Sequence, residues 1–171
     1  MWGVPGHTAF RGCYQDSHVG RHPGDMRTRP ATVADQSSLR ALAVASGSAY
    51  VPDGDVLLLA EDNTGRPLGW LAGTFQGVYP GPGAPTAPPH GYVQAVVVDA
   101  TTRRSGVGKQ LLEVFSAAAH EAGARWVFAV PDEAPGVAER MAWLSACGFT
   151  PVDDPGEPWP VMGRWAQQSP S

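Results

Sequence analysis

"VVVDATTRRSGVGKQLL" occupies residues 96–112 and joins a β-branched run to a helical pattern through a basic turn that contains glycine. Consecutive valines are typical of a buried central strand. Glycine costs a helix about 1 kcal/mol relative to alanine, so two glycines at a helix start need a reason. The first N–H groups of a helix have no intrahelical partner and lie at the positive end of its dipole. We interpret Gly106 and Gly108 as leaving these groups open to a phosphate or pyrophosphate. Three cations surround the same turn: Arg103, Arg104 and Lys109.

A glycine connection that only turns tightly is the simpler alternative, because short glycine motifs are common. The preceding strand, the arginine pair and the following amphipathic helix favour the anion site over it. The stretch contains no GxxxxGK[ST] sequence, which excludes a Walker loop. A dinucleotide-binding fingerprint also fits poorly, because no third glycine follows at the required spacing.

The rest of the chain alternates between strand-like and helix-like patterns. Seven strands are expected: residues 26–31, 55–62, 67–75, 92–100, 125–130, 149–154 and 159–166. The first helix is expected to have Thr32 as N-cap with Asp35 in a capping box, an apolar face of Leu39, Leu42 and Ala43, and an end at Gly47. The second begins near Ser105, ends at Gly123 and has an apolar face of Val107, Leu111, Val114, Phe115, Ala118 and Ala122. The third has Pro135 in its first turn and ends near Cys147. Residues 77–91, rich in proline and glycine, are expected to form a surface loop. This order predicts an α/β protein with one mixed sheet and helices on its faces.

Composition limits the class of protein and its compartment. A chain of 171 residues suits one domain, and a formal net charge of −4 argues against nucleic acid as the main partner. Cys13 and Cys147 do not form a metal-ligand spacing with the histidines, and no disulfide framework is expected, so we expect no metal and a cytoplasmic location. No apolar run approaches the length of a membrane span. Residues 1–25 are expected to be a disordered N-terminal extension, and residues 26–168 the folded domain.

Two segments resemble the acyl-CoA-dependent N-acetyltransferases of the GNAT superfamily. The core of that family's cofactor motif is [Q/R]-x-x-G-x-[G/A], which Arg103, Gly106 and Gly108 fill. "AWLSACGF" (142–149) is similar to the family's helix that ends before Gly-Phe and a late strand. With the matching element order, the resemblance covers residues 26–165. It implies a central, mostly antiparallel mixed sheet flanked by helices, with splayed central strands that form a slot for CoA.

The resemblance also implies roles for particular residues. The backbone of the turn would hold the CoA pyrophosphate, and a bulged strand 92–99 would bind the pantetheine arm through its main chain. The implied cofactor residues are Val97, Val98, Arg103, Arg104, Ser105, Gly106, Val107, Gly108 and Lys109. Where the family often has proline three residues before the arginine, this chain has Ala100, a departure that leaves the fold expectation intact.

Catalytic side chains are harder to assign. Many family members have a tyrosine four residues before the glycine of Gly-Phe, but this chain has Leu144, which cannot protonate a leaving sulfur. We therefore expect a relocated acid, with Tyr92 or Tyr79 as candidates, or a modest rate. His90 is a candidate base, although a lone histidine beside prolines is more often an ordinary surface residue. Tyr79 and His90 would recognise the substrate if the 77–91 loop closes over it; a loop without a role is about equally plausible.

The sequence therefore predicts an N-acetyltransferase that moves an acetyl group from acetyl-CoA to a primary amine of a small molecule or of a peptide or protein. The absent tyrosine favours an alternative, a non-catalytic acyl-CoA-binding module. A third possibility is a partner-binding domain with an empty glycine turn. No nucleic acid or membrane partner is expected. Exposed sheet edges and the tail aromatics Trp159 and Trp165 suggest a possible homodimer.

Overall fold

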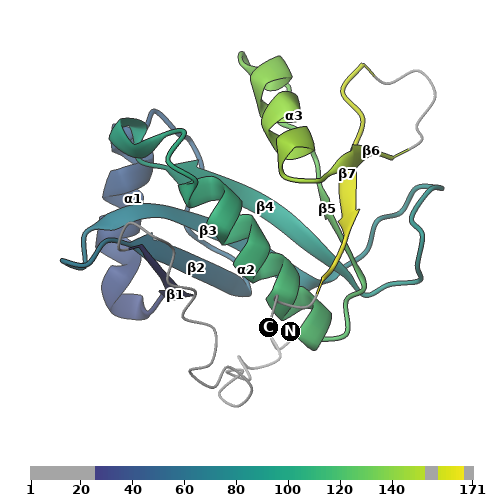
Figure 1. Cartoon of the computed structure of the whole chain (residues 1–171), viewed down its shortest axis with the longest axis horizontal. Coiled ribbons are helices and arrows are strands. Elements are labelled where there is room, and N and C mark those ends of the chain that lie inside the picture. Colours follow the sequence, from purple (N-terminus) through teal and green to yellow (C-terminus); the bar gives the residue numbers. More distant parts are fainter. Residues whose placement is uncertain (1–25, 153–157, 168–171) are drawn as a thin grey trace, which may run out of the picture.

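The computed structural model describes residues 26–152 and 158–167, which form one sheet with helices on both faces (Figure 1). The strand order in this part of the chain is β1-β2-β3-β4-β5-β7-β6, and every neighbouring pair except β4–β5 is antiparallel. The strands are β1 (Arg27–Pro30), β2 (Val56–Glu61), β3 (Pro67–Gly77), β4 (His90–Val98), β5 (Trp126–Ala129), β6 (Thr150–Pro151) and β7 (Met162–Trp165). The helices are α1 (Gln36–Ala45), α2 (Val107–Glu121) and α3 (Val137–Ala146), with short 3-10 turns η1 (Val33–Asp35) and η2 (Ala100–Thr102). The expected fold class and element order are confirmed.

Helices α1 and α2 cover opposite faces of the sheet (Figure 1). Helix α1 buries Leu39 and Leu42 against Trp70, whose indole N–H donates to the Leu39 carbonyl at 3.1 Å. Helix α2 buries Leu111 and Phe115 in the larger core on the other face. The two cores form because alternate residues of β2, β3 and β4 point to opposite sides of the sheet.

Helix α3 packs much less tightly than α2. Leu144 is its one buried residue, and in Figure 1 the helix stands away from the sheet above α2. Met141 and Trp143 are only half-buried against the core. The inner surface of α3 therefore contributes little to the folded core.

Strands β4 and β5 separate soon after they pair. Their parallel register runs only from Gly91 beside Val127 to Val93 beside Ala129, where β5 ends. On its other edge, β4 carries one extra residue, Gln94, between its pairings with Ala72 and Gly73 of β3. This bulge bends β4 at the point where β5 leaves it. The expected bulge and splayed strands are both present. Beyond Val93 the β5 side of β4 has no strand partner in the described part of the chain, and we refer to this unpaired edge as the gap.

Several expected boundaries need correction. The proline-rich loop is narrower than 77–91, because Gly77 ends β3 and His90 begins β4. Pro135 precedes α3, because the left-handed N-cap Gly136 (φ +91°) separates it from the helix. Ala122 is exposed past the end of α2, so it is not on the buried face. Strand β6 has only two residues of the expected 149–154, of which 153 and 154 lie outside the described residues, as does the 1–25 extension.

Candidate active site

The turn between β4 and α2 is exposed, and it leads into a helix start whose first backbone donors have no partner inside the helix; two of the residues that carry these donors, Val107 and Gly108, are buried. Gly106 is the helix N-cap in a left-handed conformation (φ +88°), and the first helical hydrogen bond runs from Gln110 N–H to the Gly106 carbonyl at 3.0 Å. The N–H groups of Val107, Gly108 and Lys109 therefore have no partner within the helix. Residues 103–106 are exposed, so this positive end of α2 is open to a ligand.

Arg104 is the one residue other than glycine with a left-handed backbone among residues 26–152 and 158–167 (φ +69°). That conformation costs an L-residue about 1–2 kcal/mol. Such strain tends to persist at functional sites, where the surrounding structure enforces it. The exposed guanidinium of Arg104 stands beside the open helix start, where a positive charge would assist an anion.

Two expected contributors to the anion site are engaged elsewhere. The N–H of Ser105 donates to the Thr102 carbonyl at 3.2 Å, so it does not face an incoming ligand. The guanidinium of Arg103 donates to the Ser46 carbonyl at 3.2 Å and ties this turn to the end of α1. Both contacts stabilise the turn, while Arg104 and Lys109 supply its exposed charge.

Gly106 and Gly108 are small for different physical reasons. A Cβ added at Gly106 would meet nothing within 4 Å, which fits an open ligand surface. A Cβ added at Gly108 would lie 2.7 Å from Cζ2 of Trp143 on α3 and 3.5 Å from Cγ2 of Val98. Gly108 therefore makes room for a tryptophan, and the expectation that it serves only to expose the backbone is corrected.

Strand β4 directs alternate main-chain groups into the gap. The Asp99 N–H donates to the Leu68 carbonyl at 2.8 Å, which sets the hydrogen-bonded pairs of the β3–β4 ladder. By that alternation, the main chain of Val97 faces Trp70 of β3, whereas Val96 and Val98 turn theirs toward the gap. The main chain of Val98 thus has the direction expected of it, and that of Val97 points to β3 instead. The sequence did not single out Val96, because it gives no sign of which alternate residues face β3.

His90 lies at the opposite end of β4 and is almost fully buried. Its Nδ1 accepts from the Tyr79 N–H at 3.1 Å, and its Nε2–H donates to the Thr86 carbonyl at 2.9 Å. With both nitrogens engaged, the ring holds the 78–89 loop in place and has no free nitrogen to act as a base. Its assignment as a candidate base is corrected to a structural role.

The tyrosine candidates belong to the same aromatic cluster. Tyr79 packs against Trp126 and Phe128 with ring centroids 5.7 and 5.5 Å apart, and Tyr92 stacks on Phe128 at 4.7 Å. The structure brings Tyr79, His90 and Tyr92 together, but at the end of β4 away from the glycine turn. Leu144 has no proton to donate, and its side chain is buried in the core.

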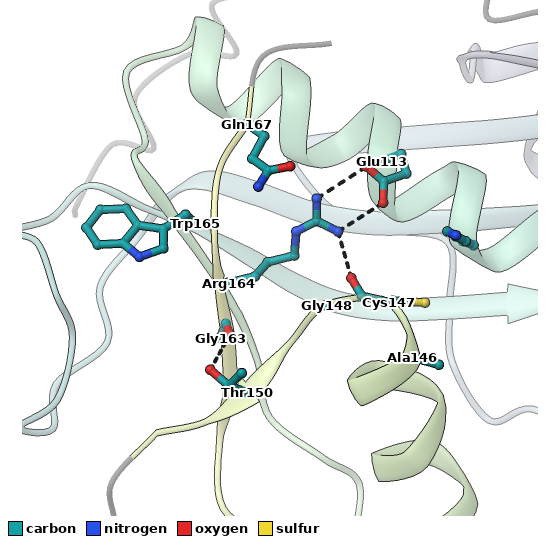
Figure 2. Close-up of a pocket in the computed structure, with 10 residues that line it drawn as sticks. Glu113, Ala146, Cys147, Gly148, Thr150, Gly163, Arg164, Trp165 and Gln167 are labelled. Carbon is teal, nitrogen blue, oxygen red and sulfur yellow. Dashed lines mark hydrogen bonds and ion pairs between the residues drawn. The ribbon is translucent and has the colours of Figure 1, made fainter. Parts of the chain in front are cut away.

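A separate surface pocket of about 400 Å³ lies between α2, the end of α3 and β7 (Figure 2). Its buried Arg164 donates to both carboxylate oxygens of Glu113, at 3.1 and 3.2 Å, and to the Cys147 carbonyl at 2.8 Å. Burial raises the pKa of the Cys147 thiol, which is consistent with a structural residue. Arg164 thus joins three elements. Lys109, which supplies exposed charge at the start of α2, also lines this pocket.

Within the described residues, no group of three or more histidine, cysteine, aspartate or glutamate side chains could hold a metal ion. None of the helices in the same part of the chain has both the length and the apolar character needed to cross a membrane.

The sequence profile of the Acetyltransferase (GNAT) family matches residues 25–149, most of the chain. The chain belongs to this family. The expected membership is confirmed, and with it the assignment as an acyltransferase. Comparison with curated proteins found no matching sequence.

Several solved GNAT structures share the fold. The aminoglycoside acetyltransferase AAC(6')-Iy, in complex with a bisubstrate analogue of CoA, aligns with a TM-score of 0.63 and 17% identity over 77% of this chain and 95% of that one. The N-acetyltransferase YhbS of Escherichia coli, in complex with CoA, aligns at 0.58 and 17% over 88% and 86%. Nourseothricin acetyltransferase aligns at 0.57 and 18% over 83% and 99%. At these identities the likeness establishes the fold and leaves this GNAT chain's acceptor open.

Proposed function

We propose that this protein transfers the acetyl group of acetyl-CoA to a primary amine of a small molecule or peptide. One observation carries the proposal: the inward main chain of Val96 and Val98 lines a gap that leads to the open, cationic start of α2. An extended arm with amide groups can pair with such a strand edge, while a diphosphate meets the N–H groups of the helix start.

The chemistry requires little beyond this main-chain frame. The nitrogen of a neutral amine attacks the thioester carbonyl carbon, and the oxygen becomes an oxyanion that the N–H of Val96 or Val98 can stabilise. The C–S bond then breaks, CoA leaves as thiolate, and the nitrogen loses its extra proton to solvent or a nearby base. Because a free thiol has a reference pKa near 8.5, the thiolate can leave without full protonation.

The alternative that the sequence raises is a GNAT-like module that binds acyl-CoA without turning it over, because leucine at position 144 has no proton to donate. Losing a general acid typically slows a reaction by about 10²–10⁴-fold, which reduces turnover without removing the binding site. The two candidates therefore share the cofactor site and differ in whether an amine reacts.

Calorimetric titration with acetyl-CoA tests the shared site. Arg104→Glu should raise the Kd by roughly 10-fold or more, a change of at least about 1.4 kcal/mol, because it reverses the charge at the helix start. Arg125→Glu is the matched control, since Arg125 is an exposed arginine just before β5. Absence of acetyl-CoA binding would refute both candidates.

Release of free thiol across a panel of amines then separates the two candidates. Turnover with any primary amine supports the transferase, whereas binding without turnover across the panel supports the module. Gly108→Glu is unsuitable as a test variant, because its side chain would collide with Trp143 and disturb α3.

A further inference from the structure

The segment between α1 and β2, residues 46–55, lies across the bulge of β4; we call it the strap. A Cβ added at Gly54 would lie 3.1 Å from Oε1 of Gln94, the bulged residue, and 3.2 Å from the Gly73 carbonyl. Pro52 is buried, and its carbonyl accepts from the Gln36 side chain at 3.2 Å. The strap is thus held against the sheet where β4 and β5 begin to separate.

A single hydrogen bond joins the strap to the segment after β5. The Tyr50 hydroxyl donates to Oδ2 of Asp132 at 2.8 Å, and Asp132 lies three residues beyond the end of β5. Since the strap contacts β4 and Asp132 follows β5, this bond spans the gap between the two strands. Both residues are exposed, so a solute can reach their polar groups.

Asp132 is suited to holding a cation. The Ala134 N–H, at 3.0 Å, and then the Tyr50 hydroxyl lower the pKa of Asp132 below its ordinary value. A carboxylate with a lowered pKa is a poor base for a reacting amine, but it keeps its charge. The nearest cation, Arg140, directs its hydrogen bonds to the main-chain carbonyls of Asp132, Ala134 and Pro135. The charge of Arg140 also lowers the pKa of Asp132, but the side-chain group hydrogen-bonded to the carboxylate is a neutral phenol.

We propose that Asp132 binds a second, non-reacting ammonium or guanidinium group of the acceptor, and that Tyr50 occupies this position until the acceptor displaces it. The acceptor is then a small amine with at least two basic groups, one reacting beside Val96 and Val98 and one held by Asp132. This inference rests on the proposed function, because it needs an amine in the gap.

Two variants that break the same hydrogen bond test the inference. Binding of spermidine and of butylamine to the CoA-saturated protein is measured by calorimetry, so that turnover is not needed. The native protein should prefer spermidine by about 10-fold, the size of one charge-assisted hydrogen bond. Asp132→Asn should abolish that preference. Tyr50→Phe should keep or increase it, because it frees the carboxylate.

A purely structural role predicts that both variants weaken spermidine binding alike, and that outcome would overturn the inference. So would an equal affinity of the native protein for the two amines. Asp55→Asn is the charge-matched control: Asp55 ends the strap and accepts from the Thr74 hydroxyl at 2.9 Å. If it abolished the preference as fully as Asp132→Asn, general charge and not Asp132 would be responsible. Failure to bind CoA at all would instead refute the proposed function.

Discussion

The two ends of β4 differ in almost every property. At the N-terminal end, β4 pairs with β5, and His90, Tyr92 and Phe128 belong to a closed aromatic cluster. At the C-terminal end, β4 no longer pairs with β5, and the main chain of Val98 faces the gap. The turn that follows is exposed and leads into α2. The closed end contains the residue types most often used in catalysis, whereas the open end offers mainly backbone.

If the proposed site is right, this difference means that the unpaired main chain of β4 is a better guide to it than the positions of histidine and tyrosine. At the closed end, both ring nitrogens of His90 are bonded to the main chain of the loop, and the rings of Tyr79 and Tyr92 pack against the aromatic cluster. The proposed cofactor site lies at the open end, where the described part of β4 has no strand partner on its β5 side.

His90→Ala should destabilise the fold at the closed end without changing the binding of acetyl-CoA at the open end. It removes both hydrogen bonds of the ring and leaves a cavity and two half-buried polar groups without partners, so we expect a loss of about 3 kcal/mol in the free energy of unfolding. Urea denaturation measures the loss, and calorimetry should show an unchanged Kd for acetyl-CoA. A weakened affinity would mean that the two ends are coupled.

Leu144→Tyr tests whether a tyrosine at this position can protonate the leaving sulfur and so raise the rate. Leu144 is 6% exposed within the core, so the larger ring should destabilise the fold by about 2 kcal/mol through overpacking. We expect no gain in kcat, because the side chain at this position points into the core. A faster enzyme would show that the helix can turn this residue toward the gap.

Arg104→Gly tests whether the left-handed backbone of Arg104, at the open end, is strained. Glycine relieves a left-handed backbone at a cost in chain entropy, so we expect a net stabilisation of about 0.5–1 kcal/mol by urea denaturation together with weaker acetyl-CoA binding. Arg103→Gly is the control, because Arg103 has an ordinary φ of −58°. That variant should lose stability.

Asp99→Asn should have the smallest effect. The Thr101 N–H lowers the pKa of Asp99, and Arg66 pairs with its carboxylate, but the group is near the surface. We expect a loss of at most about 0.5 kcal/mol at neutral pH. A lowered pKa in the folded state means that the stabilisation is present at neutral pH and is lost as the pH falls below about 4. The difference from the native protein in urea denaturation should therefore shrink progressively as the pH is lowered from 7 to below about 4.

The sequence predicted the fold well because its signals are local. The valine run of β4, the helix start at Gly106 and the hairpin of β2 and β3 each follow from neighbouring residues. The site was predicted in part, because its position follows from the strand–turn–helix order.

The remaining features depend on contacts between distant segments. The choice of Val96 over Val97 depends on the register with β3, and the burial of His90 depends on the fold of the 78–89 loop. The bond between Tyr50 and Asp132 joins residues 82 positions apart, which no pattern in the sequence indicates.

Because Trp143 lies beside Gly108, its fluorescence is expected to report on ligand binding at the start of α2. Its half-buried indole lies where α3 faces the start of α2, so any molecule that fills the gap alters the polarity around the ring. The emission of this one tryptophan, isolated from the other five by comparison with Trp143→Phe, would then follow occupancy in real time. Trp143, which packs beside Gly108 at the start of α2, would thus also allow the rate of ligand binding to be measured.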